Sequence, residues 1–410
     1  MLIEKKSFLT NYIRFAEQNP QRGAVTGAVT RVEELRSLPS LPPEILTIII
    51  SNLTVSDWTI ADLDLLNPWN PFVTHSTLLE EQNRTNIKTK HALCLVSKQL
   101  CAITMPLLYE YIWIRNSRSL FSLADQIVPN DDPKEITDRL ERHTRRLDIC
   151  VGGNTDASSG PIYIASAVLL RCCGKNLTHL SISMLMKDAI SLIHDAAVCT
   201  GLNILEWNGL PLHNLLSVDI LKTHFNQFVV LDLTDLSTLP SESMLRNVID
   251  FPHLHTLRFS ICEMIEDFTR MVLPAIRVID FEELPLRYDW DASSAAQAFI
   301  MRHGFKLQCL ILRTKMPRVN LADVPDLQHL AMHFEATGIL DAEFSLRSLE
   351  RIGILSSQQQ VTGKHIVASI RTKILARPND FPALKAIETM QLTLPHYTGR
   401  RICADFPVTD

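Results

Sequence analysis

One short hydrophobic pattern recurs along the chain from about residue 144. An apolar residue is followed three positions later by a second and two positions after that by a third, as in Leu254, Leu257 and Phe259. Alternation of the last two predicts a short strand with one buried face. A degenerate unit at Leu147 and Ile149 comes first. The central residues of the later units are Leu180, Leu205, Leu231, Leu257, Ile279, Leu310, Leu330, Ile352 and Ile387.

These units are spaced irregularly, from 20 residues (Leu310 to Leu330) to 35 residues (Ile352 to Ile387). One unit cannot bury its apolar face alone, but stacked neighbours can. The pattern resembles an irregular leucine-rich repeat, which implies an α/β solenoid with a parallel sheet on the concave face and helices on the convex face. The alternative is an α/β domain whose strands merely begin with leucine. Helical periodicity is seen in three return segments, at 187–198, 295–303 and 361–376.

The positions between the core residues of these predicted strands carry polar or charged residues in most units, as at Glu206 and Asp232, and apolar ones in others, as at Ile311. They should point to the concave face, with neighbouring strands about 4.8 Å apart. Arg258 would then lie between Asp232 and Asp280. Such a column is either a solvated ion ladder of little energetic value or a polar surface that selects a partner with basic residues. The candidate partner-binding residues are Glu206, Asp232, Arg258, Asp280, Glu282, Arg313 and His333.

The chain before the repeats shows helical rather than strand periodicity. Pro42 and Pro43 suit the first turn of a helix, where a missing N–H costs nothing, and apolar residues then recur at helical spacing from Ile45. A second stripe, from Leu93 to Ile103, predicts another helix that Pro106 ends. A short third helix would follow, and then a strand-like run at 112–114.

Three segments of this region, 41–46, 95–98 and 106–110, read Leu-Pro-Pro-Glu-Ile-Leu, Leu-Val-Ser-Lys and Pro-Leu-Leu-Tyr-Glu. Together they resemble the F-box. The resemblance implies a trio of short helices that docks onto the Skp-type adaptor of cullin–RING ubiquitin ligases. It also implies an adaptor-binding face made of Leu41, Pro42, Ile45, Leu46, Leu93, Val96, Leu100, Leu108 and Tyr109.

Residues 54–90 depart from the family pattern, because the usual F-box joins its two halves through a short loop. A structureless connection of this length is uncommon inside a compact domain, so we expect a surface insertion, inert or carrying a second contact. The predicted organisation is an N-terminal extension at 1–37, an F-box at 38–115 with this insertion, and a leucine-rich-repeat-like solenoid at 116–410.

Composition narrows the functional classes. The net charge of −5 gives no overall attraction to nucleic acid or to an anionic membrane. No stretch approaches the length of a membrane span, and the chain begins with no apolar leader. Nine cysteines without a pairing pattern argue against a disulfide framework, which favours a cytoplasmic or nuclear location.

The sequence contains none of the common catalytic motifs. There is no Gly-x-Gly-x-x-Gly, phosphate loop, Gly-x-Ser-x-Gly or His-Glu-x-x-His, and His329 and His333 lack a third ligand. We expect no catalytic residues, cofactor or metal. The resemblance implies a substrate-recognition subunit of an SCF-type ubiquitin ligase, bound through the adaptor to a cullin and to an unknown target protein. The alternatives are a repeat scaffold capped by the first helices, or an enzyme with a dispersed site.

Overall fold

The structure is a computed structural model of the 410-residue chain. The residues it describes are 42–54, 77–127, 134–151, 159–183, 192, 199–208, 225–233, 250–261, 269–283, 292–313, 319–333, 340, 345–356 and 362–391.

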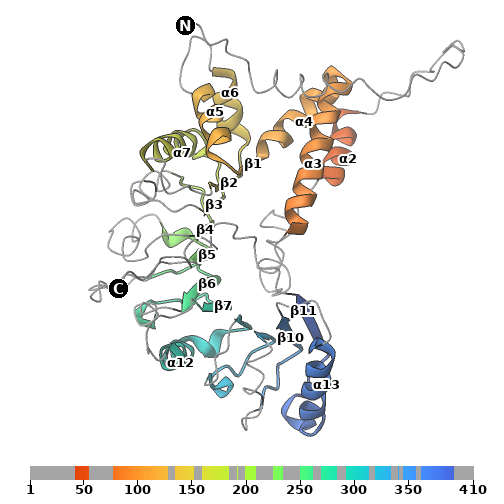
Figure 1. The fold of residues 1–410 in the computed structure, drawn as a ribbon, viewed down its shortest axis with the longest axis vertical. Helices are drawn as coiled ribbons and strands as arrows, with labels where there is room; N and C mark the ends of the chain where they lie inside the picture. Colours follow the sequence, from red (N-terminus) through yellow and green to blue (C-terminus); the bar gives the residue numbers. More distant parts are fainter. Residues whose placement is uncertain are drawn as a thin grey trace, which may run out of the picture.

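Eleven described strands form one parallel sheet in which spatial order follows sequence order from β1 to β11. The strands are short because each belongs to one repeating unit. Figure 1 shows the sheet bending along its length, with α7 (Ser159–Cys173), α12 (Ala292–His303) and α13 (Thr362–Leu375) on the outer side. The strands are β1 (Tyr111–Ile114), β2 (Arg146–Cys150), β3 (His179–Ser183), β4 (Ile204–Asn208), β5 (Val230–Leu233), β6 (Thr256–Ile261), β7 (Val278–Glu283), β8 (Cys309–Leu312), β9 (His329–His333), β10 (Arg351–Ser356) and β11 (Ala386–Gln391).

The predicted α/β architecture with a parallel sheet is therefore confirmed, including the degenerate first unit, which is β2. The helices predicted at 295–303 and 361–376 are present as α12 and α13, while most of 187–198 lies outside the described residues. The sheet begins earlier than expected, because β1 pairs in parallel with β2. Two further helices, α5 (Ser117–Ile127) and α6 (Lys134–His143), connect these two strands.

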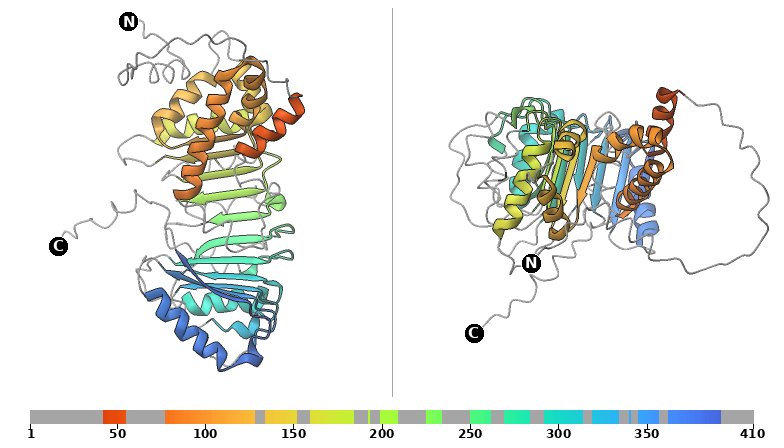
Figure 2. Two further views of the ribbon diagram at one scale, coloured as in Figure 1. Left: turned by 90° about the vertical axis from the view of Figure 1, so that its right-hand side faces the viewer. Right: turned by 90° about the horizontal axis from the view of Figure 1, so that it is seen from above.

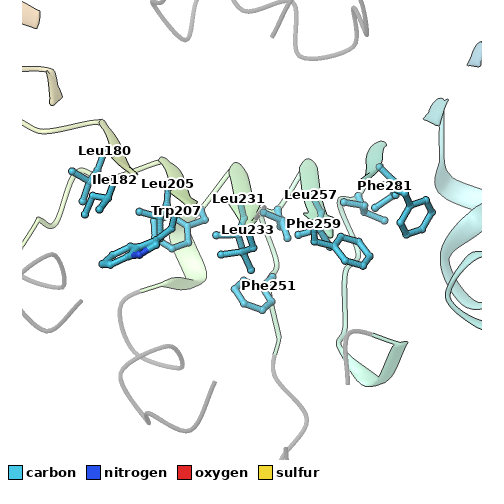
Figure 3. Close-up of a cluster of buried hydrophobic side chains, with 14 of the residues drawn as sticks. Leu180, Ile182, Leu205, Trp207, Leu231, Leu233, Phe251, Leu257, Phe259 and Phe281 are labelled. Atoms are coloured by element: carbon cyan, nitrogen blue, oxygen red, sulfur yellow. The ribbon is translucent and has the colours of Figure 1, made fainter. Parts of the chain in front are cut away.

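The core lies on one face of the sheet and runs from unit to unit without interruption (Figure 3). Two alternating positions of each strand from β1 to β10 enter it, as Leu231 and Leu233 do in β5. Next to them, Phe259, Phe281 and Phe299 pack edge to face, with ring centroids 5.1–6.0 Å apart. Such pairs add stability beyond area burial, which holds α12 against β6 and β7.

Successive units are also tied together by their backbones, just before each strand. The carbonyl of Arg145 accepts hydrogen bonds from the N–H groups of Thr178 and His179, at 2.9 and 3.0 Å. The same bond pair links every following described unit, which fixes the strands in one register. The accepting carbonyls belong to Arg145, Thr178, Asn203, Val229, His255, Arg277, Gln308, Gln328 and Glu350.

A buried histidine in the core makes stability depend on pH. His303 stacks on Phe299 at 4.8 Å, and burial, with Arg302 and Lys306 nearby, lowers its pKa from 6.5 to about 4. As the pH falls, His303 therefore takes up a proton near pH 6.5 in the unfolded chain but only near pH 4 in the folded chain. Stability from this group is complete above pH 6.5 and is lost as the pH falls towards 4.

We expect His303→Gln to lose less stability than the wild type between pH 7.5 and 5, by about 1–2 kcal/mol. Urea unfolding at each pH measures it. The matched control is His253→Gln, which makes the same substitution at an exposed histidine outside the core. Parallel pH profiles for wild type and His303→Gln would contradict the assignment.

The three helices before the sheet differ in detail from the prediction. They are α2 (Pro43–Thr54), α3 (Thr77–Val96) and α4 (Lys98–Glu110). Within the predicted insertion at 54–90, residues 77–90 are helical and form the first part of α3. This stretch lacks apolar periodicity, but it is rich in good helix formers such as Leu78, Glu80 and Gln82. Residues 55–76 lie outside the described residues.

The prediction of one continuous helix from Leu93 to Ile103 is wrong, because the helix is interrupted at Ser97. Its backbone is extended there, and its hydroxyl accepts a hydrogen bond from the N–H of Leu100 at 3.1 Å, which caps the start of α4. Pro106 does not end the helix as predicted but lies inside α4. Packing of α4 against α2, α3 and α6 offsets the hydrogen bond that proline removes.

Candidate functional site

The three N-terminal helices form one packed unit at the end of the sheet. Helix α2 packs on both α3 and α4, although 22 residues separate α2 from α3 in the sequence. Ile50 is the buried anchor of α2. Figure 2 shows α3 in front of the first strands, on the concave side of the sheet. The two halves of the predicted F-box therefore meet in space.

A buried lysine fastens α3 to α4. The Lys90 ammonium group donates a 3.0 Å hydrogen bond to the carbonyl of Leu107, one of the last four carbonyls of α4, which have no partner within the helix. Burial lowers the pKa of Lys90, and the Glu110 carboxylate partly offsets this. A cation at a helix C-terminus is also favoured by the helix dipole.

Lys90→Met is expected to destabilise the helical unit by about 1 kcal/mol, because it keeps the packed stem and loses the bond to Leu107. Relief of the buried charge limits the loss. Amide hydrogen exchange of α3 and α4 gives the local measurement. Lys88→Met, at an exposed position of the same helix, is the control; equal exchange in the two variants would refute this role for Lys90.

Large apolar side chains on this unit remain exposed. Ile48 on α2 is 56% exposed, and Leu95 and Val96 at the end of α3 are 67% and 68% exposed. Ile45 and Ile49 are also exposed. Burial of apolar surface is the main favourable term in protein association. Exposed aliphatic residues on a packed helical unit therefore indicate a docking surface.

The structure places the predicted adaptor residues unevenly. Pro42, Ile45 and Val96 are exposed, and Leu41 lies outside the described residues. Tyr109 packs against the core of the sheet, away from a docking role. Ile48, Ile49 and Leu95 were missed, although their helical spacing and apolar character are visible in the sequence. The predicted residues that are half-buried are Leu46, Leu93, Leu100, Leu108 and Tyr109.

The second candidate surface is the sheet face opposite the core, where a chain of ion pairs crosses four strands. Arg258 donates to Asp232 Oδ2 at 3.0 Å, and its Nε lies 3.5 Å from Asp280 Oδ2. Arg313 binds the same carboxylate with two groups, Nε to Oδ1 at 2.8 Å and Nη2 to Oδ2 at 2.9 Å. The expected neighbours, Asp232, Arg258 and Asp280, are therefore confirmed as partners.

Of the two alternatives for this column, the solvated ion ladder is wrong, because its central charges are buried. The buried residues of this column are Glu206, Asp232, Arg258 and Asp280, and Asp280 is 0% exposed. Charges that are buried and paired within the chain are not available to a partner, so these residues contribute stability and register. His333 and Arg313 are half-buried, and the side chain of Glu282 lies outside the described residues. Beside the ion pairs lies a small buried apolar cluster of Val278, Cys309, Ile311, Ala331 and Leu355.

A second polar cluster on the same face, over β1 to β4, was missed. Arg146 binds the Asp148 carboxylate with two groups at 2.8 and 2.9 Å, and the Tyr111 hydroxyl donates to Asp148 Oδ2 at 2.6 Å. His179 Nε2 lies 3.4 Å from Glu206 Oε1. Burial lowers the pKa of His179, and the positive charge of Arg146 lowers it further. The alternation around Leu147 and Ile149 would have placed Arg146 and Asp148 here.

No family model matches the sequence, and no curated protein matches it. Within the described ranges, no three His, Cys, Asp or Glu side chains come together as possible metal ligands. No helix of the described residues has the length and apolar character of a membrane span. The described residues form an α/β protein with a continuous parallel sheet and, at one end, a helical unit with exposed apolar side chains.

Proposed function

We propose that this chain is a substrate-recognition subunit of an SCF-type ubiquitin ligase. Its helices α2, α3 and α4 would be an F-box that binds a Skp-type adaptor and through it a cullin. The sheet, as an irregular leucine-rich-repeat solenoid, would hold a target protein. Ubiquitin transfer would be carried out by other subunits, and proximity of the bound target would make it effectively intramolecular.

The observation that carries the proposal is the exposure of apolar residues on the very helices that resemble the F-box. If these helices only capped the solenoid, their apolar residues would be buried against it. Instead Ile48, Leu95 and Val96 face solvent while Ile50 and Lys90 hold the unit together. Helix α4 also packs on α6 and β1, as a cap on the solenoid would.

The capping role of α4 favours a second candidate function, a repeat scaffold with no ubiquitin role. The two are distinguished by mixing the purified full chain with a Skp-type adaptor and measuring complex formation by size-exclusion chromatography. A stable one-to-one complex is expected. Failure of the full chain to bind the adaptor at micromolar concentration would leave the scaffold. Removing residues 1–115 is an unsuitable control, because it deletes β1 and exposes the edge of β2.

A further inference from the structure

A patch of exposed apolar side chains lies on the outer side of the sheet, away from the helical unit. Met301 in α12 and Phe305 in the turn after it are more than half exposed, and Val272 is exposed as well. Met301 and Phe305 are four residues apart in a helical stretch, so they are neighbours on its surface. The Lys306 Nζ atom lies 5.0 Å from the centre of the Phe305 ring and donates a 3.3 Å hydrogen bond to the carbonyl of Leu273, which brings Phe305 close to Val272.

The border of this patch is positively charged. Each of the three apolar residues has a cation within two positions in the sequence. These cations are Arg270, Arg302 and Lys306, and the two arginines are exposed. The backbone of Val272 bridges to Asp250, whose single negative charge leaves the border net positive. Such a surface fits a partner that presents apolar side chains among acidic ones.

The chain itself contains a segment of this chemistry, at residues 57–66 within the predicted insertion. It reads Asp-Trp-Thr-Ile-Ala-Asp-Leu-Asp-Leu-Leu, with three aspartates, five large apolar residues and no basic residue. We propose that this segment of one copy docks on the patch of a second copy, and that reciprocal exchange of the segment joins two chains in a closed dimer. The aspartates meet the cations of the border, and the apolar side chains are buried on the patch.

The partner is a second copy because the segment does not reach the patch of its own chain. Helices α2 and α3, which flank the insertion, lie on the concave side near β1, whereas α12 lies on the outer side between β7 and β8 (Figure 1). The seven strand spacings from β1 to β8 amount to about 34 Å. Asp62, at the middle of the segment, is eight residues from Thr54, the end of α2, and eight extended residues span at most about 29 Å.

The test exchanges the charges between the two sides of the contact. The patch variant carries Arg270→Glu with Arg302→Glu, and the segment variant carries Asp62→Arg with Asp64→Arg. Each variant alone brings like charges together, so its dimer is expected to be at least tenfold weaker than the wild-type dimer. An equimolar mixture pairs opposite charges at both contacts and should recover the dimer. Sedimentation velocity of the full chains at micromolar concentration measures the dimer fraction.

A control variant separates this contact from a general effect of charge. Arg118→Glu with Arg142→Glu makes the same charge change at exposed positions of α5 and α6, near the other end of the sheet, and should leave the dimer unchanged. The inference is overturned if the wild-type chain is monomeric, if either variant dimerises like the wild type, or if the mixture stays monomeric. It does not rest on the proposed function, because no adaptor is present in the measurement.

Discussion

Asp280→Asn is expected to lower the free energy of unfolding by about 3 kcal/mol. The Asp280 carboxylate is fully buried and accepts hydrogen bonds from Arg313, the residue after β8, with the Arg258 guanidinium also in contact. Asparagine keeps the shape but removes the negative charge and turns an amide donor towards a cation. Arg258 still has Asp232, whereas Arg313, whose side chain is only 8% exposed, loses the carboxylate that it binds with two groups. Urea denaturation followed by circular dichroism measures the change.

Two controls distinguish the effect of breaking a buried ion pair from the effect of breaking any ion pair. Lys385→Ala removes an ion pair of similar geometry, 2.8 Å from Glu350 in the neighbouring unit, but an exposed one. It should leave the unfolding midpoint nearly unchanged. The double change Asp280→Leu with Arg313→Met removes both buried partners and should recover at least half of the loss. Equal effects of Asp280→Asn and Lys385→Ala would show that burial does not matter here.

The neighbours in this network could be predicted from sequence because strand geometry leaves little choice. In a parallel stack of alternating strands, equivalent positions lie side by side, so aligning Leu231, Leu257 and Ile279 also aligns Asp232, Arg258 and Asp280. Burial of that column could not be predicted the same way. Alternation says which face a side chain takes and says nothing of what surrounds it on that face.

A turn signal before the strands was present in the sequence and was overlooked. The N–H of Leu254 donates to the carbonyl of Phe251, and Leu384 does the same with Phe381. These are tight turns with proline in the second position, where its fixed φ is favoured. The pattern apolar-Pro-x-apolar therefore marks the turn that precedes the strand in several units. The signal occurs at Phe251-Pro252, Leu273-Pro274, Val324-Pro325 and Phe381-Pro382.

Apolar periodicity alone does not locate the break between α3 and α4, because it takes no account of helix capping. Leu93, Val96 and Leu100 keep helical spacing across Ser97, so period alone predicts one helix. The serine, placed three residues before a free helical N–H, is the better indicator of a new start. Conversely, Pro106 was weighed too heavily, because a buried helix can keep a proline when its neighbours pack on both sides.

Ile48→Lys combined with Leu95→Lys and Val96→Lys is expected to weaken binding of a Skp-type adaptor at least 100-fold. Each side chain would lose its burial in the complex and place a charge in an apolar contact, and two or three such residues carry most of the energy of a typical interface. The thermal melt should hardly move, since all three positions are exposed in the isolated chain. Lysine is also a good helix former and suits the C-terminal end of α3. Isothermal titration with the adaptor measures the affinity.

The matched control for these lysine changes is Ile164→Lys. Ile164 lies on α7 and is 60% exposed, so the change adds the same charge at an equally exposed aliphatic position of the sheet region. It should leave adaptor binding unchanged. If the triple variant and Ile164→Lys bind alike, the exposed residues of α2 and α3 are not the contact. Because the control removes the general effect of added charge, a loss confined to the triple variant assigns the docking face to these helices.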